Sequence, residues 1–175
     1  MSEVKPKPAT RPEPWMRGPI AGVDPLLAPL LYCFEQARED ITKYASDLTI
    51  EQLWARPHGF GSAGFHIRHA GGAADRLCTY IEGGQLSAEQ LFFLQNEMDE
   101  GVSFEAVFAE LDGSLKRVED VVRALDPATL REPRTVGRKK LPTTVIGLIV
   151  HICEHTQRHV GQTISAAKLA KVAAA

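Results

Sequence analysis

Apolar residues recur every three or four positions along four long stretches of the chain, and this spacing constrains its fold most. The clearest stretch, residues 103–125, carries one stripe formed by Phe104, Val107, Phe108, Leu111, Leu115, Val118 and Val122. Such a period is typical of a helix that buries one face. Similar patterns cover residues 25–48, 62–82 and 142–171. Four long helices with short connections predict an all-α four-helix bundle.

Residues that favour helix ends add detail to this prediction. Asp24 is a candidate cap for the first helix and Ser62 for the second. Thr49 and Ser87 are each followed three residues later by a glutamine, which is the capping-box pattern and predicts two further short helices. Residues 131–141 contain a Thr-Val-Gly-Arg sequence between extended residues, which predicts a short hairpin-like insertion before the last helix.

The first nineteen residues form a different kind of segment. Prolines are concentrated there, and this excludes a continuous helix. We expect residues 1–19 to form a Pro-rich arm, with Trp15 and Met16 as candidate anchors on the body of the protein. Residues 20–175 are expected to form the single bundle domain, because a chain of 175 residues suits one domain.

Composition excludes several classes of partner. The chain has 20 Lys and Arg residues against 22 Asp and Glu residues, so it lacks the excess positive charge that nucleic acids and acidic membranes attract. Its longest apolar run, residues 145–150, is far shorter than the roughly 20 residues of a membrane span. Three cysteines without a C-x-x-C pair indicate reduced thiols. We therefore expect a cytoplasmic protein with neither nucleic-acid nor membrane partners.

The histidines carry most of the chemical information. His151, His155 and His159 follow one another at four-residue spacing on the last predicted helix, and His66 and His69 lie on the second. Since successive helical residues turn by about 100°, His155 and His159 share one face, and His159 falls inside the apolar arc. His66 and His69 both fall on the inward arc of their helix. His151 lies further out.

Several inward imidazoles in one core point to a metal. Each neutral ring has to satisfy one donor and one acceptor nitrogen, which is costly for a group of rings unless something ties them together. Imidazole is the commonest protein ligand for a divalent metal, and a metal would satisfy several rings at once. The residues alone leave both His66 and His69 open as the ligand from the second helix, and a hydrogen-bonded core histidine is the alternative for each.

Other chemistry is less well supported. Residues 151–155 fit the H-x-x-E-H pattern of some zinc proteases, with Glu154 as the base, but Glu154 falls on the polar face about 100° from His155. Cys153 lies about 160° from His155, so we expect it to pack rather than to act as a nucleophile. Glu154 and Asp75 are expected to be solvated surface charges.

Both of the predicted helices that carry histidines contain motifs that resemble those of one known family. The sequence HTQRHVGQ at residues 155–162 resembles the H-x-x-x-H-x-G-Q signature of the DinB/YfiT-like metalloenzyme superfamily. The sequence SAGFHIRHAGG at residues 62–72 resembles the second-helix motif of that family, in which a histidine follows the capping serine by some seven residues. This register selects His69 rather than His66. The resemblance covers most of residues 24–170.

The resemblance implies a fold and a site. The fold is an up-down-down-up four-helix bundle. The site is a divalent metal, zinc or nickel, with water in an open position and three ligands, His69, His155 and His159. Residues expected around these ligands, without binding the metal, are His66, His151 and Gln162.

The resemblance also implies an activity. Members of the family include S-transferases that use bacillithiol, mycothiol or glutathione, and dimers are common among them. We therefore expect a homodimeric thiol S-transferase or hydrolase acting on a small molecule, with a low-molecular-weight thiol as a candidate partner. The alternative is a non-catalytic metal-binding or dimerising module.

A group of basic residues lies just before the last helix, namely Arg131, Arg134, Arg138, Lys139 and Lys140. If the hairpin overhangs the metal end of the bundle, these side chains would attract an anionic substrate. Otherwise they are solvated surface charges.

Overall fold

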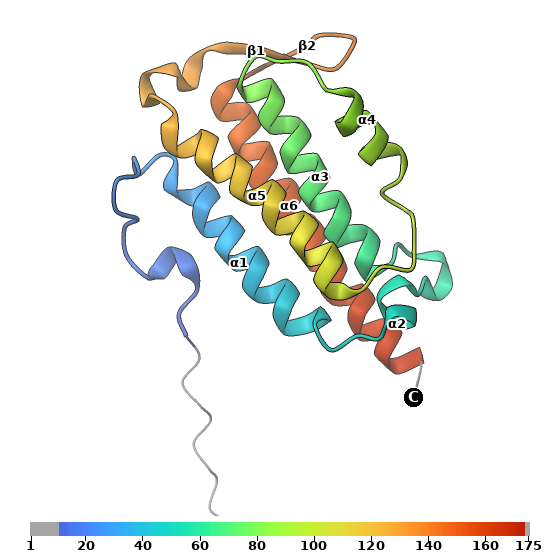
Figure 1. Cartoon of the computed structure of the whole chain (residues 1–175). Helices are drawn as coiled ribbons and strands as arrows, with labels where there is room; N and C mark the ends of the chain where they lie inside the picture. The colour runs from blue at the N-terminus through green and yellow to red at the C-terminus, as the bar shows by residue number, and fades with distance from the viewer. Residues whose placement is uncertain (1–10, 174–175) are drawn as a thin grey trace, which may run out of the picture.

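The fold is dominated by four long helices (Figure 1), seen in a computed structural model that describes residues 11–173. These helices are α1 (Ala28–Ala45), α3 (Ala63–Ile81), α5 (Phe104–Ala124) and α6 (Val145–Ala173). The shorter elements are α2 (Ile50–Trp54), α4 (Ala88–Gln95), the 3-10 turns η1 (Pro14–Met16), η2 (Pro57–Gly59) and η3 (Pro127–Arg131), and the strands β1 (Pro133–Val136) and β2 (Leu141–Thr144). The all-α prediction is confirmed, since the described residues hold only this two-stranded sheet.

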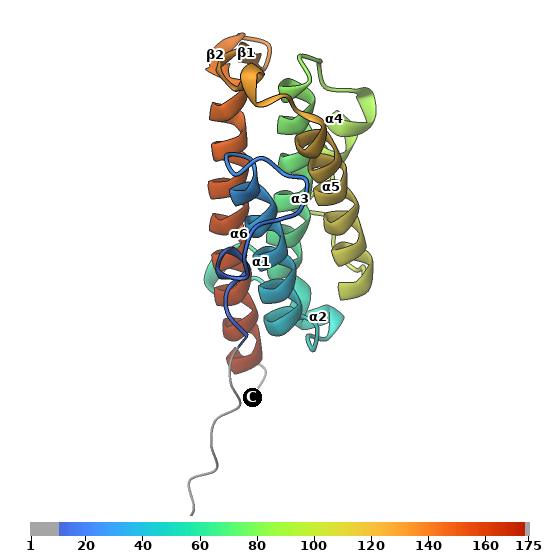
Figure 2. The same cartoon turned by 90° about the vertical axis from the view of Figure 1, so that its left-hand side faces the viewer.

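The long helices lie side by side around one apolar core. Helix α3 packs against both α5 and α6, and α1 packs against α6 and, less extensively, α5. The colour gradient of Figures 1 and 2 shows that α1 and α6 run in one direction and that α3 and α5 run in the other. Ile67, Leu111 and Ile152 are fully buried where these helices meet. Among residues 11–173, no helix combines the length and the apolar character that a bilayer crossing requires.

Three of the predicted helix caps, those at Ser62, Thr49 and Ser87, are present in the structure. The Ser62 hydroxyl accepts a hydrogen bond from the Phe65 amide at 3.2 Å, at the start of α3. Thr49 and Ser87 each form a complete capping box with the glutamine three residues later. These caps satisfy backbone donors that a helix N-terminus leaves without a partner, so their positions fix where the helices begin.

The first helix begins at Ala28 rather than at Pro25. Asp24 closes a separate turn, because its side chain accepts from the Leu26 amide at 2.8 Å while its carbonyl accepts from the amides of Leu27 and Ala28. This turn changes only the start of the buried face, and Leu30, Phe34 and Ile41 further along α1 are buried. Leu26, near the start of the predicted pattern over residues 25–48, is 64% exposed, and Leu27 is buried in its place.

The hairpin is confirmed, and it delays the last helix by three residues. β1 and β2 pair antiparallel from Pro133 with Thr144 to Val136 with Leu141. The backbone of residues 141–144 is therefore extended, and α6 begins at Val145 rather than near Pro142. The Thr144 hydroxyl accepts from the Gly147 amide at 3.1 Å and caps the new helix start.

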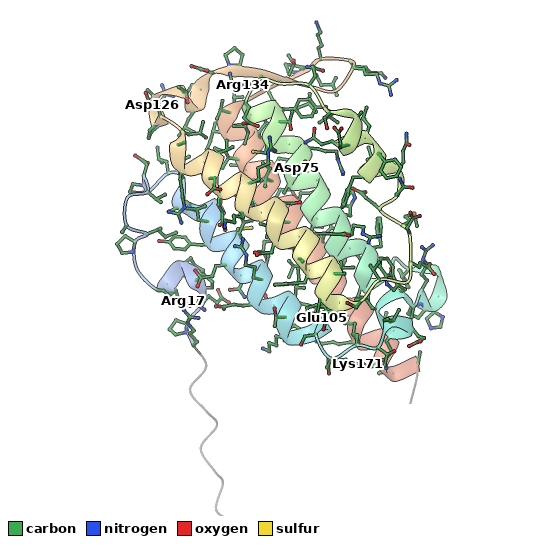
Figure 3. The ribbon with its side chains drawn as sticks, viewed as in Figure 1. Arg17, Asp75, Glu105, Asp126, Arg134 and Lys171 are labelled. Atoms are coloured by element: carbon green, nitrogen blue, oxygen red, sulfur yellow. The ribbon has the colours of Figure 1, made fainter. Side chains whose placement is uncertain are left out.

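Residues 11–19, which we call the strap, lie along α1 (Figures 1 and 2). The predicted anchors are wrong, because Trp15 is 63% and Met16 is 51% exposed. Instead Pro14 is buried, and Arg17 donates hydrogen bonds to Glu35 and Glu39 on α1 (Figure 3). A guanidinium can bind two carboxylates at once, which suits a segment with few backbone partners of its own. Residues 1–10 of the predicted arm lie outside the described residues.

Candidate metal centre

Three histidine rings from two helices converge between α3 and α6. His155 and His159 lie one turn apart on α6, with ring centroids 4.6 Å apart. His69 on α3 faces both, at 5.1 Å from His155 and 4.5 Å from His159. One nitrogen from each ring lies within 4.8 Å of the others, so the three rings can hold a metal ion. The group contains His69 and not His66.

The orientation of His69 is fixed by a buried carboxylate. The Nδ1 atom of His69 lies 2.7 Å from Oε2 of Glu97, a residue that is 3% exposed. A carboxylate accepts, so Nδ1 donates and Nε2 keeps the lone pair that a metal needs. The other oxygen of Glu97 accepts from Arg76 at 2.6 Å. The ring of Phe65 stacks on His69, with centroids 5.4 Å apart.

The close packing around this carboxylate requires a glycine. A Cβ atom added at Gly72 would lie 2.8 Å from Oε1 of Glu97 and 2.6 Å from the ring of Phe93. Sequence reasoning missed Glu97 and Arg76, because Glu97 follows α4 in the chain and no helical spacing relates it to His69. The glycine pair at residues 71–72 is the signal that could have indicated a close approach to this face of α3.

His66 performs a similar task for His159. It is 8% exposed, and its Nδ1 atom lies 3.1 Å from Nδ1 of His159. When Nδ1 of His159 is the donor and Nδ1 of His66 the acceptor, Nε2 of His159 keeps the lone pair that a metal needs. His66 therefore lies beside the three-histidine group and contacts one member of it.

The sequence profile of the DinB superfamily matches residues 34–163 of the chain. The chain belongs to the DinB superfamily. The matched range contains the three converging histidines, their partners His66 and Glu97, and Arg76. A comparison with curated proteins finds none that matches this chain.

In this DinB-superfamily protein, burial keeps the imidazole rings of His155, His159 and His66 uncharged. Burial, together with the neighbouring His69 ring, lowers the pKa of His155 to about 4 and the pKa of His159 to about 3. The same two causes lower the pKa of His66 to about 4. These rings are therefore neutral at pH 7, which is the form that binds a metal.

The outermost histidine belongs to a surface network. The side chain of His151 is 48% exposed, and its Nδ1 atom lies 2.7 Å from Oε1 of Glu154. Glu154 also accepts from Arg158. Glu154 is thus an exposed charge, as expected, and it is not oriented as the base of a protease site. His151 contacts the ring of His155, with centroids 5.6 Å apart, but lies outside the three-histidine group.

Gln162 lines a groove beside the histidines. This groove of about 440 Å³ is bounded by Phe60 and Gly61 on one side and by the outer face of α6 on the other. His66 and Arg158 also line it. Of the histidines on α3 and α6, His66 alone is among the lining residues, so the groove approaches the three-histidine group from the side of His66. The groove is large enough to receive part of a small molecule.

The basic hairpin does not overhang the histidines. Arg134 donates to the carbonyl oxygen of Ile81 at 2.8 Å, which places the hairpin at the C-terminal end of α3 (Figure 3). His69 lies twelve residues earlier on α3, about 18 Å along the helix axis. The expectation that these cations attract a substrate to the metal end is therefore wrong.

Two other expectations concern single side chains. Asp75 is not a solvated charge, since it accepts from Arg117 at 2.9 Å and from Gln90 at 2.5 Å (Figure 3). It joins α3 to α4 and α5 rather than serving the site. Cys153 faces α1, where its carbonyl accepts from Cys33 Sγ at 3.3 Å, consistent with a packing role. All three cysteines are free thiols.

Proposed function

We propose that this protein is a divalent-metal-dependent enzyme that acts as a thiol S-transferase or a hydrolase on a small molecule. The ligands in this proposal are His69, His155 and His159. The observation that carries it is the convergence of three imidazole nitrogens from α3 and α6 within 4.8 Å.

We further propose that residues 20–175 form one DinB-like domain with the up-down-down-up order. The opposed helix directions in Figure 1 support this proposal.

The donor set fits a catalytic ion better than a structural one. Three neutral imidazoles leave the charge of a divalent ion uncompensated, and three protein ligands leave room for an exchangeable one. An ion held in this way lowers the pKa of a thiol or a water molecule that binds to it. Zinc and nickel are the proposed ions, because both suit imidazole ligands.

The protein's own side chains supply orientation and access. Glu97 holds His69 through Nδ1 at 2.7 Å, and His66 holds His159 at 3.1 Å, so two of the three rings are fixed before an ion arrives. The groove beside His66 offers the substrate the amide of Gln162 and the guanidinium of Arg158.

Metal content tests the ligand assignment. We expect about one zinc or nickel ion per wild-type chain and loss of that ion when His69, His155 or His159 is replaced by alanine. The matched control is His151→Ala, which removes an exposed imidazole from the same face of α6 and should retain the ion. Full retention by His155→Ala or His159→Ala would refute the site. Loss with His66→Ala and retention with His69→Ala would show that His66 is the ligand.

Thiol titration separates the two proposed reactions. In cobalt-substituted protein, direct binding of a thiolate gives a sulfur-to-cobalt charge-transfer band. An S-transferase should show this band with bacillithiol, mycothiol or glutathione and should consume an electrophile only when the thiol is present. A hydrolase should instead be inhibited by the same thiols. Neither binding nor turnover would favour a non-catalytic metal-binding module.

We also propose a homodimer, on the strength of the family resemblance. Exposed apolar side chains on and after α4 support this proposal, because Phe92 is 68% and Met98 is 51% exposed. Light scattering at micromolar concentration should give twice the chain mass of 19.2 kDa. A monomer under these conditions would contradict the proposal.

A further inference from the structure

We propose that the space between the strap and α1 is a second ligand site, separate from the histidine cluster, and that it binds an organic cation. A cavity of about 580 Å³ lies there, larger than the groove beside the histidines. The strap, α1 and α6, which lie close together in Figure 2, all contribute lining residues. Gln157, its lining residue from α6, projects about 160° away from His155 and His159, so the two sites lie on opposite faces of that helix.

The wall formed by the strap is held in place. Arg17 has a side chain that is only 16% exposed, and its Nη1 atom donates to Glu35 at 2.6 Å and to Glu39 at 2.7 Å. One residue further along, the hydroxyl of Tyr32 donates to the carbonyl oxygen of Gly18 at 2.7 Å. Bonds to two carboxylates and a tyrosine fix the strap over α1, so the cavity is a built feature of the fold.

The lining combines aromatic rings with carboxylates. Trp15 and Tyr32 supply the rings, and Glu13 and Asp40 supply the negative charge. No lysine or arginine is among the lining residues. The carboxylates are oriented by neutral donors, since Glu13 accepts from the Trp15 indole at 2.7 Å and Asp40 accepts from Gln36 at 2.8 Å. Within residues 11–173 neither forms an ion pair, so both charges are available to a ligand.

This chemistry selects an organic ammonium ion. The face of an indole or phenol ring attracts a cation, and a carboxylate nearby adds to that attraction. The prolines of the lining, Pro14 and Pro29, give an apolar surface for an alkyl or aryl group. A neutral ligand would not form an ion pair with the carboxylates. A metal ion would bind the carboxylates without contacting the aromatic rings. The volume lies within the range of about 300–1,000 Å³ that is typical of small-molecule sites.

The test is calorimetric titration of the full-length protein with two probes, choline and benzyltrimethylammonium. The uncharged comparator is 3,3-dimethyl-1-butanol, in which carbon replaces the choline nitrogen. We expect saturable binding of the cations and binding of the alcohol that is about tenfold weaker or undetectable. Absence of saturable binding for both cations, or equal affinity for choline and the alcohol, would overturn the proposal.

Variants locate the site. Trp15→Leu and the double variant Glu13→Gln/Asp40→Asn should each weaken cation binding about tenfold. The matched control is Asp120→Asn, which removes an exposed carboxylate from α5 and should bind as the wild type does. The far-ultraviolet spectrum of each variant checks that it is folded. Unchanged binding in both cavity variants would place the cation elsewhere and refute the site. Binding by His155→Ala should equal that of the wild type, whatever the outcome for the proposed metal function.

Discussion

Glu97 is the residue on which the orientation of His69 depends. It is almost fully buried, and each of its oxygens has a charged or polar partner, Arg76 on one side and His69 on the other. A buried carboxylate is tolerated only when it is paired in this way. Its position therefore links a ring that can bind a metal to a guanidinium on the same helix.

Replacing Glu97 with glutamine should weaken metal binding without removing a ligand. The amide keeps the size of the side chain but loses the charge that orients His69 and balances Arg76, and such partners typically account for about 10–100-fold in affinity. Competition with a chelator measures this loss. The exposed Glu89 on α4 gives the control, since Glu89→Gln should bind metal as the wild type does. Equal affinities in the two variants would show that Glu97 does not position the ring.

At the scale of elements, α3 and α5 approach each other closely at Gly71. A Cβ atom there would lie 2.9 Å from Cα of Leu111, which is backbone and cannot rotate away. We expect Gly71→Ala to destabilise the protein by about 1–3 kcal/mol, as overpacking does. Gly113 on α5 is the matched control, because nothing lies within 4 Å of its added Cβ. Gly113→Ala should stabilise the protein by about 0.5–1 kcal/mol, through the helix propensity of alanine.

Urea denaturation of the two glycine variants measures both changes. The opposite signs are the diagnostic feature, since a general effect of glycine-to-alanine substitution in a helix would stabilise both. A higher free energy of unfolding for Gly71→Ala than for the wild type would mean that α3 and α5 can move apart without destabilising the protein.

The stability that the strap contributes to the fold should depend on pH through Glu39. Arg17, which donates to Glu39, holds the pKa of that carboxyl below its usual value, and Arg11 adds to the effect. The unfolded chain therefore binds this proton at a higher pH than the folded chain does. The contribution to stability is complete above the usual pKa and is lost as pH falls through the lowered one, below about pH 4.

Thermal melts of the wild type and of Glu39→Gln test this dependence. The wild type should have the higher Tm at pH 7, and the difference should shrink as the pH falls below about 4. Glu35, the other carboxylate that Arg17 contacts, remains in both proteins. A difference in Tm that does not change with pH would show that the ion pair is not its source.

For the whole molecule, a bound metal ion should raise the free energy of unfolding. An ion that binds only the folded state adds about 2.7 kcal/mol when its free concentration is a hundred times Kd. For a chain of this size, that corresponds to an increase in Tm of roughly 5–10 °C, which a chelator should reverse. The His155→Ala variant should show no shift with added zinc or nickel. A shift of equal size in that variant would place the ion at another site.

The sequence predicted features that depend on residues close together in the chain. The capping boxes at Thr49 and Ser87, the hairpin and the inward faces of His69 and His159 all follow from local spacing. Local spacing puts the starts of α1 and α6 three residues too early, because the Asp24 turn and the pairing of β2 use residues that also suit a helix. Glu97 could not be predicted, since only the packing of the segment after α4 against α3 brings it to His69.

Two of the three converging imidazoles share α6, and the third comes from α3. The separation of His155 and His159 is fixed by the pitch of a single helix, whereas their separation from His69 depends on how far apart the axes of α3 and α6 lie. The distance from His69 to the two histidines of α6 is therefore the distance in this group that helix packing can change. Substitutions in the packing between these two helices would change the size of ion that fits, and hence the preference between metals, without altering any histidine.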